Sequence, residues 1–255
     1  MIQMKRRQSR HVGSKWVKTA AIERYRRLRR HVPETRKLSR TNLEELLNRY
    51  GMVYVKPDTG TYGKGVMKIG KLQGGGYYSR EKDRTRYHGS REALYRAIAA
   101  RSRGRRYLVQ QGIHLLAYRG RLFDVRVMVQ KNPQRKWETT GIIGRAARPS
   151  YVVTNYHSGG RPMDVRTLLA PHLTVPQIRA MTARLSRIGR DAAAALGSVY
   201  PGVNMVGADI GVDARRNCWI IELNTSPDPY LFRFLKDRSV SRKVLRYARA
   251  LKRIP

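Results

Sequence analysis

Apolar and polar residues change period along the chain, and this change predicts helices first and strands afterwards. Between residues 14 and 31, apolar side chains recur at close to helical spacing with Arg and Lys between them, which predicts one basic amphipathic helix. Pro33 is expected to end this helix. A second helix is predicted over residues 39–50, with Ser39 or Thr41 as its N-cap.

Most elements after residue 51 show a period close to two. Residues 52–56 and 66–72 predict a β-hairpin whose tip, 58–65, is rich in glycine. Residues 122–130 alternate apolar with mostly polar side chains, as a strand with one buried face does. The other expected elements are a turn at 74–76, a helix at 91–101, strands at 107–111, 137–146 and 151–155, a helix at 176–196 ending near Gly197, strands at 205–212 and 218–223 around a turn, and a basic helix at 239–251.

The order of these elements favours an α+β protein. Helices come first, mixed strands follow, and a long helix precedes a final hairpin, with no repeated strand–helix–strand unit. The 255 residues fit one large domain or two small lobes that share a cleft. With 41% hydrophobic residues, the chain is expected to fold around a true core and not to be disordered.

The single cysteine and the lack of long apolar runs narrow the expected cellular setting. Cys218 excludes an internal disulfide and a cysteine-rich zinc site, and beside Trp219 we expect it to be a packed core thiol. We find no secretory signal and no apolar run long enough to span a bilayer. A cytoplasmic protein without a membrane span is therefore expected.

The charge is the unusual feature of the composition. Lys and Arg number 54 against 17 acids, which gives a formal net charge of +37. Such a surface attracts nucleic acid, nucleotides, acidic peptides, anionic polymers or acidic lipids by the same physics. The alternative is an Arg-rich surface that only confers solubility. Charge alone therefore selects no partner.

Because acids are scarce, three oxygen-bearing residues near the C-terminus are informative. Asp209 lies on one strand of the last hairpin, and Glu222 and Asn224, two residues apart, share a face of the partner strand. If the hairpin folds near residues 215–217, the three side chains meet and form a hard-cation site suited to Mg²⁺. The alternative is a solvated face paired with nearby arginines, although apolar neighbours make an unpartnered carboxylate costly there.

The glycine-rich hairpin tip is a candidate phosphate site. Gly60 and Gly63 let backbone N–H groups approach a phosphate closely, and Lys56 and Lys64 would neutralise it. Lys64 is followed by Gly65 and not by Ser or Thr, which excludes a P-loop. The alternative is an ordinary turn.

Taken together and in this order, the pieces resemble the ATP-grasp superfamily from about Ser14 to Asp228. Within the superfamily, residues 31–35, 53–57 and 62–65 are similar to the YheC/YheD-type endospore coat-associated proteins. The resemblance implies an α+β ATP-grasp fold, with two α+β lobes, a nucleotide cleft between them and the N-terminal substrate domain largely missing. The implied parts are a basic helical segment at 1–40, a small lobe with a glycine-rich flap at 41–112, a large lobe with the magnesium site at 113–238 and a basic helix at 239–255.

Two further patterns support the resemblance. Asp209 lies thirteen residues before Glu222, and the run from Glu222 to Pro227 is similar to the magnesium site of amino-acid ligases in the superfamily. Arg145 and Asn155 resemble residues of glutamate-ligase-type members. The chain is thus expected to bind ATP and Mg²⁺.

The resemblance implies a role for each site residue. The expected ATP ligands are Lys15 and Lys56 as the two ATP lysines, the flap residues Gly60, Thr61, Tyr62, Gly63 and Lys64, the adenine hinge at Gln110, Gln111 and Ile113, and Asp124 at the ribose. The expected catalytic residues are Arg126 at the transferred phosphate and Arg145 and Asn155 at the substrate or acyl phosphate. Asp209, Glu222 and Asn224 are expected to hold the metal.

Three functions remain open on the sequence. The resemblance favours an ATP- and Mg-dependent carboxylate–amine ligase that works through an acyl phosphate on an acidic or peptide substrate. The alternative is a non-catalytic ATP-binding scaffold that is associated with a spore coat and has affinity for a polyanion. Either function is compatible with an oligomer or a partner protein. A nucleic-acid-binding protein ranks third, because only charge supports it.

Overall fold

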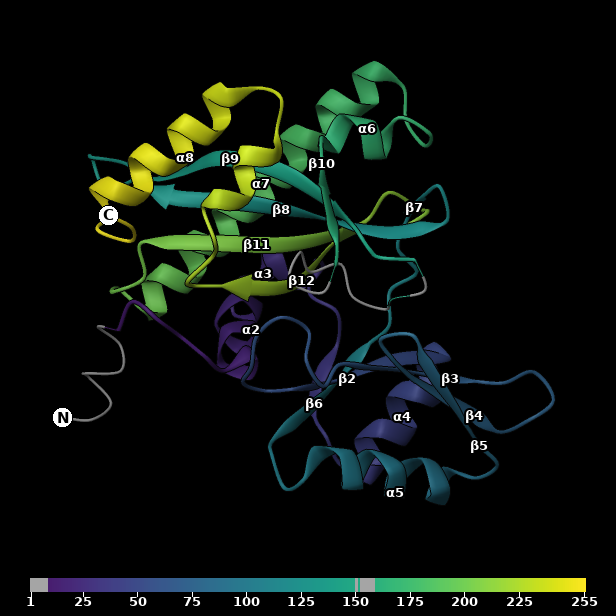
Figure 1. The fold of residues 1–255 in the computed structure, drawn as a ribbon. Helices are drawn as coiled ribbons and strands as arrows, with labels where there is room; N and C mark the ends of the chain where they lie inside the picture. The colour runs from purple at the N-terminus through teal and green to yellow at the C-terminus, as the bar shows by residue number, and fades with distance from the viewer. Residues whose placement is uncertain (1–8, 150, 152–158) are drawn as a thin grey trace.

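Two antiparallel sheets organise the computed structural model, which describes residues 9–149, 151 and 159–255 (Figure 1). The first sheet has the order β1 (Thr35–Lys37), β6 (Tyr107–Gln111), β2 (Met52–Pro57), β3 (Met67–Lys71), β4 (Tyr77–Glu81) and β5 (Arg84–His88). The second has the order β10 (Arg161–Met163), β9 (Trp137–Ala146), β8 (Arg121–Lys131), β11 (Met205–Val212) and β12 (Cys218–Asn224), with β7 (Ala117–Tyr118) paired to β8. The expected α+β class is confirmed.

The first sheet has one apolar face and one polar face. In β2, Val53 and Val55 are fully buried in a cluster with side chains of α4 (Arg40–Tyr50) and α5 (Arg91–Ser102). Since side chains alternate along a strand, Tyr54 and Lys56 point the other way, toward the second sheet. Period-two patterning therefore decides that Lys56 faces away from the helices.

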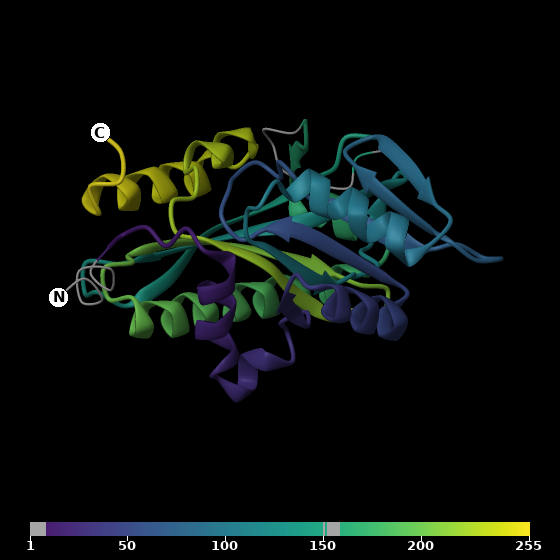
Figure 2. The ribbon, with the colours of Figure 1, turned by 90° about the horizontal axis from the view of Figure 1, so that it is seen from below.

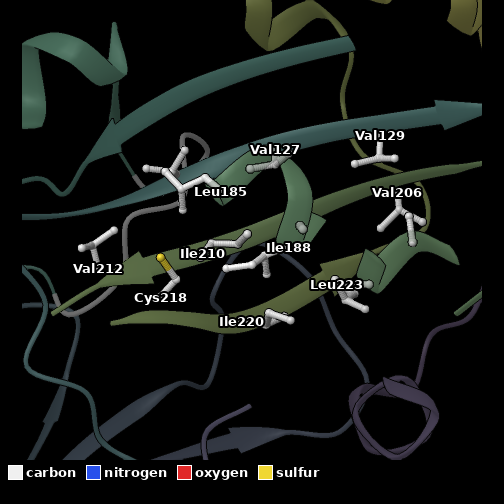
Figure 3. Packing of buried hydrophobic residues seen from close by; sticks show 14 of the residues in the cluster. Val127, Val129, Leu185, Ile188, Val206, Ile210, Val212, Cys218, Ile220 and Leu223 are labelled. Carbon is white, nitrogen blue, oxygen red and sulfur yellow. The ribbon is translucent and has the colours of Figure 1, made fainter. Parts of the chain in front are cut away.

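The second sheet is covered on both faces. The helix α7 (Val175–Val199) packs on one face, and α8 (Arg238–Ala250) with the 3-10 helix η2 (Tyr230–Phe234) packs on the other (Figure 2). Figure 3 shows the α7 side, where valine, isoleucine and leucine side chains from β8, β11 and β12 meet Leu185 and Ile188. The helices α2 (Lys15–Glu23) and α3 (Arg26–Arg29) pack on α7, and the short α6 (Val165–Leu169) lies near β9.

The central strand β8 is buried on both faces. Val125 and Val127 lie on the predicted buried face, which packs against α7, and Asp124, Arg126 and Met128 on the opposite face are also buried. The polar face is therefore not solvated. It lies at the cavity between the two sheets and beneath η2 and α8.

Two helix boundaries differ from the sequence prediction. The helix expected over residues 14–31 is broken between α2 and α3, because Tyr25 has extended backbone angles and its hydroxyl lies 2.6 Å from Ser198 Oγ. The long helix continues past Gly197 to Val199. Gly197 is a close-approach residue and not a helix end, since an added Cβ would lie 2.7 Å from Trp137 Cζ2.

Several strands were not predicted: β1, β4, β5, β7 and β10. In β5 every residue from Arg84 to Tyr87 is exposed, so the hairpin has no apolar alternation to reveal it. The strand expected at 151–155 lies outside the described residues except for Tyr151, which is not in a strand. The expected domain boundaries after residues 40, 112 and 238 remain predictions. The expected N-terminal segment does contribute to both halves of the fold, because β1 lies in the first sheet while α2 packs beside the second. No helix in the described ranges has the length and apolar character needed to cross a bilayer.

The contact between α7 and β8 depends on a glycine. A Cβ at Gly189 would lie 2.6 Å from Val127 Cγ1. Although alanine raises helix propensity by about 1 kcal/mol, we expect Gly189→Ala to lower the free energy of unfolding by about 1–2 kcal/mol because of this overlap. Urea unfolding would measure the loss. Arg187→Ala, at an exposed position of the same helix, should change stability by less than about 0.5 kcal/mol, and equal effects would contradict the packing argument.

Candidate nucleotide and metal site

A cavity of about 300 Å³ lies between the two sheets. Every predicted site residue that the structure describes lines this cavity: Lys15, Lys56, Gly60, Thr61, Tyr62, Gly63, Lys64, Gln110, Gln111, Ile113, Asp124, Arg126, Arg145, Asp209, Glu222 and Asn224. Asn155 lies outside the described residues. Residues as far apart in the chain as Lys15 and Asn224 are thus brought to one cavity, and their individual roles remain predictions.

Three buried lysines dominate one wall. Lys15, Lys18 and Lys56 are each less than a tenth exposed. The Lys56 ammonium donates to Gln110 Oε1 at 2.8 Å and to the carbonyl oxygen of Ile221 at 3.2 Å. Burial lowers its pKa to about 8, and the neighbouring Lys15 and Lys18 add to this while Glu222 opposes it. The wall therefore carries more positive charge than its own partners balance, which favours an anionic ligand.

Lys18 is a site residue that the sequence analysis missed. It lies one helical turn after Lys15 on the same face of α2, so a search at spacing i+3 could have found it. Burial lowers the Lys18 pKa, with Lys15 as a further cause and Glu222 opposing it. A positive charge is costly at this position without a negative ligand.

Asp58 was also missed, and it connects the glycine loop to α2. Its carboxylate accepts from Ser14 Oγ at 2.8 Å and 2.9 Å and from the backbone N–H of Trp16 at 2.9 Å. A carboxylate at a helix N-terminus is stabilised by the exposed N–H groups there. Lys15 closes the connection by donating from Nζ to the carbonyl oxygen of Gly60 at 3.0 Å. The first lysine and the glycine loop are therefore tied together by hydrogen bonds.

The glycine loop has the backbone conformation that its sequence requires. Gly60 and Gly63 have φ of 136° and 67°, and Tyr62 between them has φ of 60°. Such angles suit glycine and let backbone N–H groups approach a ligand. Tyr62 is half exposed at the mouth of the cavity.

Two backbone N–H groups of the expected adenine hinge are already hydrogen-bonded to neighbouring segments of the first sheet. Gln111 donates its backbone N–H to the carbonyl oxygen of Glu34, and Gly112 donates to that of Met52. The Gln110 side chain positions Lys56 and also donates to Thr35 Oγ1 at 2.8 Å. A backbone contact to adenine would thus have to use Ile113 N–H or the Gln111 carbonyl.

A buried chain of alternating charge forms the opposite wall. Arg126 donates from Nε and Nη2 to the two oxygens of Asp209, and Arg145 donates in the same forked way to Asp124. Arg145 Nη2 also lies 3.0 Å from Asp209 Oδ2, which joins the two pairs. Burial opposes the charged form of Asp209, but Arg126 and Arg145 more than offset it and hold its pKa below the usual value.

This network of ion pairs restricts the roles predicted for Asp124 and Arg145. Burial likewise opposes the charge of Arg145, but Asp124 and Asp209 outweigh it and raise the Arg145 pKa. If Asp124 contacts a ribose, it must do so with the lone pairs that Arg145 leaves. The sequence analysis treated these residues as separate ligands, and only the paired register of β8, β9 and β11 makes them one network.

A β-bulge directs the polar side chains of β12 into the cavity. Asp209 lies opposite Glu222, whereas Ile210 lies opposite Ile220, so Ile221 is the extra residue. The bulge keeps both Ile220 and Leu223 in the core while Glu222 and Asn224 line the cavity. The prediction that Asp209 and Glu222 come together across this hairpin agrees with the register.

The oxygen donors can be tested for their fit to Mg²⁺. A carboxylate offers about four lone-pair positions, and Asp209 already accepts three guanidinium contacts. Glu222 lies 3.6 Å from Lys15 Nζ, and Asn224 Oδ1 accepts from the Ser226 N–H. Within the described ranges, no three His, Cys, Asp or Glu side chains are grouped as a metal site. An ion bound here would therefore take few protein oxygens and complete its shell with water and phosphate, as Mg²⁺ does in proteins.

Comparison with protein families decides the relationship. The model of the YheC/D-like ATP-grasp domain matches residues 7–251. The chain belongs to the YheC/D-like ATP-grasp family. The resemblance drawn from residues 31–35, 53–57 and 62–65 is thereby confirmed.

Two curated relatives come from Bacillus subtilis (strain 168). The chain is 25% identical over 195 residues to the endospore coat-associated protein YheD, covering 74% of this chain and 42% of YheD. It is 22% identical over 224 residues to the endospore coat-associated protein YheC, covering 86% of this chain and 61% of YheC. The chain thus spans less than two thirds of either relative.

Solved structures confirm the ATP-grasp fold of this family member. D-cycloserine synthetase DcsG matches with a TM-score of 0.56 and 14% identity, over 93% of this chain and 70% of that one. The N5-carboxyaminoimidazole synthetase from Staphylococcus aureus, complexed with ADP, matches with a TM-score of 0.56 and 9% identity, over 92% and 51%. The carboxyaminoimidazole ribonucleotide synthase from Aspergillus clavatus, complexed with ATP, matches at 0.52 and 12%, over 85% and 45%.

The lowered pKa of Lys56 has a measurable consequence for stability. Between pH 8 and 10.5 the unfolded chain keeps a proton on this lysine that the folded chain has lost. Stability therefore rises with pH in this window, by up to ~1.4 kcal/mol per pH unit for this one group. Compared with Lys56→Met, the wild-type protein should become relatively more stable from pH 7 to pH 9.5 in urea unfolding.

The matched control is Lys236→Met, which removes an exposed lysine. Its stability difference from the wild type should stay constant over the same pH range. A constant difference for Lys56→Met as well would show that Lys56 has an ordinary pKa.

Proposed function

We propose that this chain is an ATP- and Mg-dependent carboxylate–amine ligase that works through an acyl phosphate. The observation that carries the proposal is that three buried lysines and the acid–amide set of β11 and β12 line the same cavity. The lysines would neutralise a triphosphate, and the oxygens would hold its divalent cation. The known fold of the family supports this reading.

In this proposal residues of α2, β2 and the glycine loop bind and cover ATP. Lys15 and Lys56 contact phosphates, with Lys18 beside them, and the loop from Gly60 to Lys64 closes over the triphosphate. When the Lys15 ammonium donates to a phosphate of ATP in place of Gly60, the Gly60 carbonyl oxygen loses its present hydrogen-bond donor. Nucleotide binding and loop position are therefore coupled through one hydrogen bond.

Asp209, Glu222 and Asn224 would hold Mg²⁺. When bound, the ion would neutralise charge on the phosphate oxygens and orient them. Arg126 and Arg145 lower the pKa of Asp209, which favours its ionised form. A cation at this site would share the Asp209 carboxylate with these two guanidinium groups.

The chemical steps need positioning and charge neutralisation, not a side-chain nucleophile. A substrate carboxylate oxygen attacks the γ-phosphorus, the bond to the β–γ bridging oxygen breaks and ADP leaves. A substrate amine then attacks the acyl carbon, inorganic phosphate leaves and the amine nitrogen loses a proton. Lys56 and Arg126 would stabilise the negative charge that develops on the transferred phosphoryl group.

The second substrate is expected to be acidic or a peptide, because the formal charge of +37 exceeds what ATP requires. Arg145, and Asn155 from outside the described residues, would contact its carboxylate or the acyl phosphate. The proposed setting is the cytoplasm or a forming spore coat, since both curated relatives are named endospore coat-associated. A partner protein or an oligomer is part of the same proposal.

The second candidate is a scaffold that binds ATP without turnover. The names of the curated relatives favour it, and so does the engagement of both Arg126 and Arg145 with buried acids. It predicts nucleotide binding without phosphate release. Polyanion affinity could accompany either function.

Substitution of Glu222 tests the ligase proposal. Glu222→Gln removes a metal-binding charge but keeps the lysines, so we expect phosphate release to fall at least ~100-fold while ATP still binds. The measurement is phosphate release with Mg-ATP and a panel of amino acids and acidic peptides, paired with calorimetric ATP binding.

Glu92→Gln, an exposed acid on α5, is the matched control and should behave like the wild type. Unchanged turnover in Glu222→Gln would remove Glu222 from the mechanism. Wild-type protein that binds ATP but releases no phosphate with any member of the panel would support the scaffold.

A further inference from the structure

A second cavity, of about 630 Å³, lies at the end of the second sheet where β8 turns into β9. Its walls come from the segment before α2, the end of β8, the turn into β9, the chain after α7 and the end of α8. In Figure 1 the arrow tip of β8 and the end of α8 lie together on the left of the molecule. It shares no lining residue with the cavity between the sheets.

The lining is cationic without any acid. Arg10, Lys131, Arg135 and Arg246 contribute four positive groups, and no Asp or Glu lines the cavity within the described residues. The high net charge of the chain does not by itself explain this. The cavity between the sheets contains four acids, the small one by α4 and α5 contains Glu44, and the one beside β4 and β5 contains two acids.

In the described part of the chain the four cations also form no ion pairs, because the nearby Glu138 is engaged by Tyr247 and Lys243. Across the described ranges, no ion pair joins any of them to a carboxylate. Lys131 lies 5.2 Å from the Trp137 ring centre and Arg246 lies 5.6 Å from that of Tyr247, which orients them without neutralising them. Burial and the nearby Arg135 lower the pKa of Lys131. Gathered like charges of this kind are relieved by a multivalent anion.

An amide group supplies a second, independent sign of a ligand. The side-chain oxygen of Asn204, which lines this cavity, is buried and has no hydrogen-bond partner in the structure. A buried acceptor without a donor costs about 1–3 kcal/mol. A rotation of the amide that turns the oxygen toward the cavity would let a ligand hydroxyl satisfy it.

We propose that this cavity binds a small molecule bearing an oligophosphate chain. The guanidinium groups of Arg10, Arg135 and Arg246 and the ammonium of Lys131 would hold phosphate oxygens, and a ligand hydroxyl would donate to Asn204. Phosphate fits better than carboxylate because several charges must be concentrated in one small volume, and guanidinium forks match phosphate oxygens. The site is concave and built from five segments, which suits a compact ligand. The proposal does not depend on the ligase function.

The test uses inorganic tripolyphosphate and isothermal titration calorimetry on the full chain. All measurements are made in the Lys56→Met background, so that binding in the first cavity is weakened. Saturable binding of one tripolyphosphate is expected. Arg10→Ser combined with Arg246→Ser should weaken it at least about tenfold, whereas Arg26→Ser combined with Arg96→Ser, which removes two exposed arginines elsewhere, should change it less than about twofold.

An added acid gives an independent measurement that removes no existing contact. Ala250 is exposed at the cavity and Ala100 is exposed on α5, so Ala250→Glu should weaken binding and Ala100→Glu should not. Equal weakening by both members of either pair would show general charge attraction and overturn the proposal. Absence of saturable binding in the Lys56→Met background would overturn it as well.

Discussion

The burial of ammonium groups between the two sheets is the constraint on which the site depends. Lys15, Lys18 and Lys56 come from two elements and are each less than a tenth exposed. Their partners are mainly neutral oxygens, such as Gln110 Oε1 and the Gly60 carbonyl, with Glu222 as the near carboxylate. Folding therefore places positive charge where water is scarce, and a bound polyanion offsets that cost. A site arranged in this way exchanges stability of the free protein for affinity.

The opposite wall of the cavity buries negative charge instead of positive charge. Asp124 and Asp209 are buried acids, and two forked arginine pairs satisfy them. Such pairs are weak contributors to stability but strongly restrict geometry, because removing one partner leaves an uncompensated buried charge. The network therefore holds β8, β9 and β11 in one arrangement beneath the cavity. Glu222, on the bulged strand, is left to meet the lysines and the proposed cation.

The two cavities differ in the kinds of charged side chain that line them. The first mixes lysines with acids and an amide, which suits a metal-bound nucleotide. The second has cations alone, together with an unsatisfied amide oxygen, and suits an anion that brings no metal. Net charge cannot distinguish these cases, because it counts residues and not the acids placed beside them.

The sequence by itself determined the elements whose apolar period is strong and the residues whose spacing is local. The strand at 122–130 and the shared face of Glu222 and Asn224 follow from period two, and the strand at 107–111 follows from a short apolar run, so neither inference needs knowledge of a partner strand. Tertiary structure alone decided the break after α2, the pairing of Arg145 with Asp124 and the contact between Asp58 and Ser14. It also decided the bulge at Ile221, which aims Glu222 into the cavity. These features join residues distant in the chain, and their free energy depends on which surfaces the fold brings together, so no local pattern encodes them.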